Sequence, residues 1–188
     1  MITGMNVLER TGCLKVTLVI FLFFIVSSSM GQLHPVKEES NVHFIIHNFG
    51  FKVSGSLASP EGEIVFIPED PAKSSFRVTI KSESIFTDNN SRDEHLKEED
   101  YFDVKNHPLI RFASSGVRAT GKNGSYEATG ILTIKDKNKE IKLPFTAVKS
   151  GSGWLFAGGF KMNRRDFGVG GSSTISNELT VEIKVVAR

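Results

Sequence analysis

Residues 91–112 carry most of the side chains that could do acid–base chemistry. His95 and His107 lie there among carboxylates, with Asp93 two residues before His95. A histidine near a carboxylate is a common general acid–base pair, and the same residue types bind metal ions. The spacing fixes no third ligand, so a structural or solvated role is the commoner interpretation. We predict no metal site here and keep acid–base chemistry by Asp93 and His95 as an alternative.

A second candidate is the pair Arg164 and Arg165, which precedes the glycine-rich residues 168–173. Backbone N–H groups of such a loop, together with guanidinium groups, can hold a phosphate head group. The loop lacks the Lys-Ser/Thr ending of a nucleotide P-loop. We favour a structural interpretation, in which one arginine pairs with an acidic residue of 91–112, because a buried arginine usually needs such a partner.

Other reactive groups are sparse. His43 and His47 share one face of a predicted strand about 13 Å apart, too far to chelate one metal ion, and we predict that both lie on the surface. No Gly-x-Ser-x-Gly elbow or similar nucleophile pattern is present. We therefore predict a protein that is not an enzyme and that uses no cofactor.

The N-terminal residues have the pattern of a secretory signal. Arg10 and Lys15 precede an apolar run over residues 16–26, and small residues follow up to Gly31. The run is shorter than the roughly 20 apolar residues that a membrane-spanning helix needs. We predict a signal peptide over residues 1–31, a single domain over residues 32–188, and a periplasmic or secreted location. The one cysteine, Cys13, lies in the predicted signal.

Charge and aromatic composition narrow the function classes. The formal net charge is +2, which gives no electrostatic case for binding nucleic acid. The chain has 15 Phe against two Tyr and one Trp, so most aromatic area has no polar group. Such side chains suit a dry interior or an apolar ligand.

The elements that must position these residues are strands. Apolar and polar residues alternate through most of residues 42–187, most clearly where Phe76, Val78 and Ile80 alternate with polar neighbours. We count eight to nine strands and no helix long enough to cover a sheet. A sheet with one apolar face must then close on itself or pair with another sheet. We predict an all-β fold, an eight-stranded antiparallel β-barrel, with a sandwich as the alternative.

One helical segment interrupts the strands. Ser91 and Glu94 have the spacing of a capping box, Tyr101 and Phe102 give a second short turn an apolar edge, and Pro108 restores extended chain. A structured connection of this length is often a lid or binding loop, although plain surface packing is commoner. We predict a short helical lid between two strands.

Four ordered motifs resemble the YceI-like family, also called the polyisoprenoid-binding family. They are Arg92-Asp93-x-His95-Leu96, Tyr101-Phe102-Asp103-Val104 with His107-Pro108 and Ile110-x-Phe112, Gly130-x-Leu132-Thr133-Ile134, and Asn163-Arg164-x-Asp166-Phe167-Gly168. The resemblance covers about residues 42–187 and departs at Asn48, where many relatives carry histidine. It implies a lipocalin-like barrel, exported to the bacterial cell envelope, with a long apolar pocket for an isoprenoid tail.

The resulting hypothesis is an exported protein that holds an isoprenoid, a quinone or a fatty-acyl-type lipid inside the barrel. A lipid-modifying enzyme using Asp93, His95 and Arg164, and a barrel with a filled interior that acts through its surface, remain the alternatives. A homodimer is left open. The predicted ligand-binding residues are Phe44, Ile46, Phe76, Val78, Ile80, Leu96, Phe102, Phe112, Leu132, Leu143, Phe156 and Phe160, with Arg92 and Arg164 near the mouth.

Overall fold

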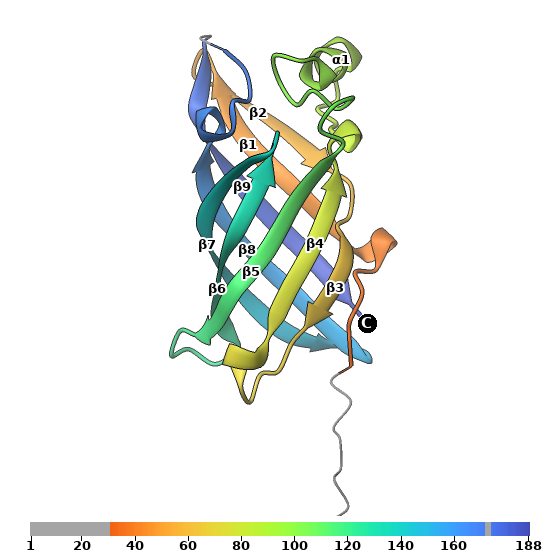
Figure 1. The fold of residues 1–188 in the computed structure, drawn as a ribbon, viewed down its shortest axis with the longest axis vertical. Helices are drawn as coiled ribbons and strands as arrows, with labels where there is room; N and C mark the ends of the chain where they lie inside the picture. The colour runs from red at the N-terminus through yellow and green to blue at the C-terminus, as the bar shows by residue number, and fades with distance from the viewer. Residues whose placement is uncertain (1–30, 172–173) are drawn as a thin grey trace, which may run out of the picture.

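The computed structural model describes residues 31–171 and 174–188 (Figure 1). The predicted signal peptide lies outside the described residues except for Gly31. In the described part of the chain, no helix is long and apolar enough to cross a bilayer.

Nine strands form one antiparallel sheet in the order β2-β1-β9-β8-β7-β6-β5-β4-β3 (Figure 1). Strands that are consecutive in the chain pair with each other, except that β2 and β3 do not pair and that β9 also pairs with β1. The strands are β1 (Asn41–Asn48), β2 (Phe51–Leu57), β3 (Glu61–Val65), β4 (Ser75–Lys81), β5 (Leu109–Ala119), β6 (Ser125–Ile134), β7 (Lys137–Ser150), β8 (Gly153–Asn163) and β9 (Ile175–Ala187).

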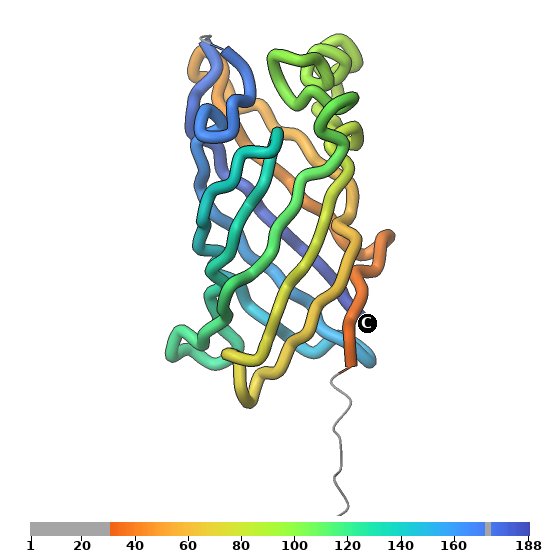
Figure 2. Tube along the Cα trace, in the orientation of Figure 1, coloured from red at the N-terminus to blue at the C-terminus, as the bar shows by residue number. Residues whose placement is uncertain are grey.

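The sheet curls round on itself, but its edge strands β2 and β3 do not pair with each other. Short segments bridge the opening instead. Leu33 exchanges two hydrogen bonds with Ile64 of β3, and Ser56 of β2 exchanges two with Phe86. The segment before β1 also runs beside the chain's C-terminal end in Figure 2, where Pro35 bridges to Ala187.

The predicted fold class is therefore confirmed: an all-β antiparallel sheet curled into a barrel-like shape, with one short helix. The strand number is nine rather than eight. Because β2 and β3 are edges that do not pair with each other, closure depends on the bridging segments rather than on a continuous ladder.

Side chains of neighbouring strands meet in register on the inner face. Phe112 of β5 lies opposite Val78 of β4 and Leu132 of β6, so three apolar groups form a row across the sheet. Such cross-strand pairs stabilise a sheet because their side chains touch on the same face. The alternation seen in the sequence thus becomes a continuous apolar inner wall.

Aromatic rings fill one end of the barrel. Phe66 makes edge-to-face contacts with Tyr126, Trp154 and Phe156, at centroid distances of 5.1, 4.9 and 5.2 Å. Phe76 contacts Phe156 in the same way at 5.6 Å. Edge-to-face pairs add to the gain from burial alone. This aromatic cluster closes the end at which β7 turns into β8.

The other end carries helix α1 (Asn90–Lys97) between β4 and β5 (Figure 1). The helix is capped by Asn89, whose side chain accepts a hydrogen bond from Arg92 N at 2.9 Å. The predicted Ser91–Glu94 capping box is therefore wrong, because Ser91 lies inside the helix and Glu94 pairs with Lys97. Asn caps as well as Ser, so local preference did not decide between them.

We expect Phe156→Ala to lower the free energy of unfolding by about 3–5 kcal/mol, because Phe156 is only 2% exposed and its loss leaves a cavity in the aromatic cluster. The exposed Phe86 is the matched control, and Phe86→Ala is expected to change it by about 0.5 kcal/mol or less. Urea denaturation measures both. Equal losses would contradict this account of the core.

Candidate functional site

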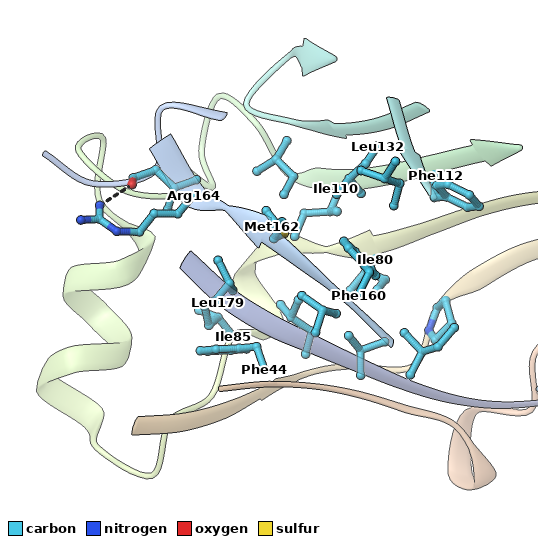
Figure 3. A pocket seen from close by; sticks show the side chains of 18 of the residues that line it. Phe44, Ile80, Ile85, Ile110, Phe112, Leu132, Phe160, Met162, Arg164 and Leu179 are labelled. Atoms are coloured by element: carbon cyan, nitrogen blue, oxygen red, sulfur yellow. Dashed lines mark hydrogen bonds between the residues drawn. The ribbon is translucent and has the colours of Figure 1, made fainter. Parts of the chain in front are cut away.

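An apolar cavity lies between the aromatic cluster and the α1 end of the barrel. Its volume is about 250 Å³. Figure 3 shows aliphatic and aromatic side chains of several strands pointing into one space, with Arg164 at the end nearest α1. Polar side chains in the lining are few: Asn48, Thr87, Arg92, Tyr101, Arg111 and Arg164.

The structure places every sequence-predicted ligand-binding residue in the lining of this cavity. Phe76, Leu143 and Phe156 belong to the buried cluster at the closed end and form the floor. Leu96 and Phe102 come from the α1 segment and form the opposite end. The others belong to the strand walls: Phe44, Ile46, Val78, Ile80, Phe112, Leu132 and Phe160. Their role as ligand contacts stays a prediction.

Several lining residues were missed by sequence reasoning. Leu179, Val181 and Ile183 of β9 had a usable signal, because they alternate with exposed or partly exposed neighbours on a predicted strand. Ile85 and Val169 had none, since both lie outside strands and no periodicity marks which way a loop residue points. Figure 3 shows Ile85 and Leu179 close to Phe44 in the wall of the cavity.

Two residues of the first family-like motif fasten the helix to the chain before it. Asp93 is 6% exposed, and its Oδ1 accepts hydrogen bonds from both Thr87 N and Thr87 Oγ1. Arg92 donates from Nε to Thr87 Oγ1 and from Nη2 to Thr87 O, each at 2.7 Å. A buried carboxylate is tolerated when it receives such bonds. The pair therefore fixes α1 over the cavity.

The acid–base alternative loses its support from this geometry. Asp93 is occupied by Thr87, and the His95 ring packs edge-on against Tyr101 with centroids 4.8 Å apart. The other histidine, His107, has Nδ1 2.9 Å from Asp136 Oδ2, but the two atoms do not form a hydrogen bond. In the described residues, no group of three or more His, Cys, Asp or Glu side chains is placed to hold a metal ion.

Arg164 organises the loop that leads into β9. It is 5% exposed and donates from Nη1 to Val169 O at 2.7 Å, and from Nε to Ser176 O at 3.0 Å. Nη2 lies within hydrogen-bond distance of Ile175 O and two further acceptors. Burial lowers the pKa of this guanidinium from its ordinary value, and the charge of Arg165 acts in the same direction. The group still remains protonated at neutral pH.

The expected ion pair between Arg164 or Arg165 and the acidic lid is wrong. Among the described residues, Arg164 bonds to carbonyl oxygens and to the Asn177 amide, and no salt bridge of either arginine to a carboxylate is found. Carbonyl dipoles satisfy a buried guanidinium as hydrogen-bond acceptors, a solution that residue type alone does not indicate. The loop carbonyls fix Arg164, and Arg164 in turn fixes the loop.

The α1 segment and the Arg164 loop are joined by hydrogen bonds to main-chain carbonyl oxygens. Gly170 N donates to Asp100 O at 2.7 Å, and Lys135 Nζ donates to Glu99 O at 2.6 Å and to Gly168 O at 3.3 Å. Lys135 comes from the tight turn between β6 and β7. Three separate connections therefore meet at the open end of the cavity and form its rim.

Comparison with known proteins relates the chain to a family of such barrels. A family model described as a YceI-like domain matches residues 34–187. A UPF0312 protein of Pseudomonas savastanoi pv. phaseolicola is 30% identical over 151 residues, which cover 76% of this chain and 77% of that protein.

Solved structures agree on the fold. Burkholderia cenocepacia BcnA superposes with a TM-score of 0.76 at 26% identity, covering 80% of this chain and 98% of that one. A polyisoprenoid binding domain from Saccharophagus degradans, implicated in plant cell wall breakdown, superposes with a TM-score of 0.67 and covers 83% of this chain and 97% of that one. It is 9% identical, so the likeness shows the fold alone.

We expect Asp93→Ala to lower the free energy of unfolding by about 3 kcal/mol, because it leaves the Thr87 N–H and hydroxyl groups without their acceptor. Hydrogen exchange should accelerate over residues 85–97. Glu94→Ala on the exposed side of α1 is the control and should cost about 0.5 kcal/mol or less. Unchanged exchange in the Asp93 variant would show that this carboxylate does not hold the lid.

Proposed function

This chain belongs to the YceI-like domain family, and from that premise we propose that it is a binding protein that holds one long apolar lipid chain in the barrel cavity. The observation that supports this proposal most directly is the apolar cavity. A single cavity surface is built almost entirely from apolar side chains of the sheet, with an aromatic floor at one end and a polar rim at the other.

The energetic reason is the transfer of hydrocarbon out of water. Each methylene removed from water contributes about 0.8 kcal/mol, so a chain of moderate length gains enough to overcome the cost of association. An apolar lining offers no polar groups that a hydrocarbon would leave without partners. The cavity of this chain therefore favours a tail rather than a polar metabolite.

Cavity size sets the length of tail that it can take. If each water-sized group takes about 10–15 Å³, the cavity of about 250 Å³ has room for on the order of 20 non-hydrogen atoms. That corresponds to roughly four isoprene units or a long fatty-acyl chain. A longer prenyl or quinone tail would extend past the rim.

A polar head group fits best at the α1 end. Arg92 lines the cavity there and uses Nε and Nη2 for Thr87, while no hydrogen bond from Nη1 to a described residue is found. Nη1 is thus a donor for a phosphate, hydroxyl or quinone oxygen. The Saccharophagus degradans domain is named for polyisoprenoid binding, which supports an isoprenoid-type ligand as the first choice.

We place the protein in the periplasm or outside the cell and assign it no catalysed reaction. The predicted signal peptide over residues 1–31 supports action in the periplasm or outside the cell, where an insoluble lipid needs a carrier. We assign no catalytic residue, because Asp93 and His95 are engaged in holding and packing the lid.

Binding should strengthen with chain length and then level off. In a series of prenyl alcohols from C10 to C30, we expect the free energy of binding to become more favourable up to about 20 carbons and to change little beyond, because further carbons lie outside the cavity. Displacement of a fluorescent fatty acid measures the series. No uptake of any member would refute the proposed function.

Filling the cavity should block it. Leu179 points into the cavity from β9, so Leu179→Trp is expected to weaken binding of a C20 prenyl alcohol at least about tenfold while the protein stays folded. Glu182→Trp, on the exposed face of the same strand, is the matched control and should bind normally. Circular dichroism verifies folding, and equal affinities would show that the tail binds elsewhere.

A further inference from the structure

Two phenylalanine rings project into solvent at the tip of the β1–β2 hairpin. Phe49 is 74% exposed and Phe51 is 77% exposed, which makes them the most exposed large apolar residues among those described. They are separated only by Gly50. Single exposed apolar residues are ordinary on protein surfaces, but two aromatic rings on one turn form a distinct apolar tip.

The backbone shows that folding does not explain Phe49. Its φ is +49°, and Gly50 follows at +82°, so the turn has the left-handed pair typical of a two-residue hairpin. Asn and Gly adopt this conformation readily, whereas a bulky aromatic residue there is an outlier. Packing of the Phe49 ring does not offset the cost of this conformation, because the ring is exposed. An outlier without structural benefit points to a function.

The hairpin tip lies at the rim of the cavity. Asn48, which precedes Phe49, and Val53, two residues after Phe51, line the cavity. Thr174 Oγ1 donates to Asn48 Oδ1 at 2.8 Å, which joins the hairpin to the chain following the Arg164 loop. That loop in turn contacts the lid through Gly170 and Asp100. Figure 1 shows the hairpin and α1 at the same end of the barrel.

Charge distinguishes the hairpin from the lid. Residues 41–58 contain no Asp or Glu, and the exposed face of the hairpin near its tip carries His47 and Lys52. Across the rim, Arg165 and Asp166 are both exposed. The lid from 88 to 103 is strongly acidic. A surface that contains anionic lipid is negative, so the hairpin rather than the acidic lid is the part of the rim whose charge suits contact with it.

Area argues for a bilayer rather than a folded partner or a second copy. A phenylalanine buries about 150–250 Å², so the two rings offer far less than the roughly 1,200 Å² of a specific protein interface. Insertion into a bilayer needs no complementary partner surface. Contact with a membrane surface gains from buried apolar area and from attraction of cationic side chains to anionic lipid, and this tip offers both.

We propose that the Phe49–Phe51 tip docks the barrel on a lipid bilayer and brings the cavity rim to the membrane surface, where the lipid chain enters or leaves. This rests on the proposed function and extends it. The lipid then passes between bilayer and cavity at the docked rim, so its hydrocarbon spends little time in water. Docking sets the rate of exchange, while the cavity sets the affinity.

Vesicle flotation with phosphatidylcholine containing a minor share of phosphatidylglycerol tests the docking. The wild-type protein should float with the vesicles, and the variant with Phe49→Ser and Phe51→Ser should bind them at least about tenfold more weakly. Val148→Ser is the control, since Val148 is exposed near the β7–β8 turn at the closed end of the barrel. Wild-type protein that does not float, or a double variant that floats equally well, overturns the proposal.

A kinetic measurement separates docking from binding. Uptake of a fluorescent prenyl probe from vesicles should slow at least about tenfold in the double variant, whereas its affinity for a short, water-soluble prenyl probe should not change. Failure of wild-type protein to bind the soluble probe would refute the proposed function instead. If the double substitution converts a dimer to a monomer in sedimentation, the tip is a self-association surface and the membrane proposal falls.

Phe49→Asn supplies a further readout that a structural role would not give. Asn is favoured over Phe at positive φ, so this variant should melt at a higher temperature than wild type while binding vesicles more weakly. A lower melting temperature would show that Phe49 serves the fold, and it would overturn the inference.

Discussion

A curled sheet with one apolar face has to fill its own interior, and the rest of this structure depends on how far that filling goes. Phe66, Phe76, Phe145 and Phe156 meet as interlocking rings at one end, where the chain packs as a protein core. Toward α1 the inward side chains do not meet across the whole interior, and a cavity remains. A filled end supplies stability, which leaves the other end able to stay hollow.

The rim of the hollow is built from a different kind of interaction. Arg164 donates hydrogen bonds to loop carbonyl oxygens, and Asp93 accepts hydrogen bonds from Thr87. Lys135 donates hydrogen bonds to two carbonyl oxygens of other segments. These bonds are directional and join connections that also pack apolar residues such as Phe167 and Val169 beneath them. Side chains that resemble a catalytic set in the sequence therefore serve to hold loops over an apolar cavity.

The two ends of the molecule divide its tasks. The closed end has the aromatic core and the N-terminal segment, which bridges from β3 to β9. The open end has the lid, the Arg164 loop and the hairpin with Phe49 and Phe51. The exposed rings of Phe49 and Phe51 and the positive φ of Phe49 lie at this open end, where we propose that a lipid passes.

The sequence by itself determined the fold class and the inward faces, because alternation is a local property: the Phe76-Val78-Ile80 pattern fixes one face whatever lies across from it. It could not give the cap at Asn89, the carbonyl partners of Arg164 or the lining role of Ile85 and Val169. Those depend on which loops meet at the rim. Only the tertiary structure decided that the barrel is filled at one end and hollow at the other, because that outcome depends on how side chains from many strands meet in three dimensions.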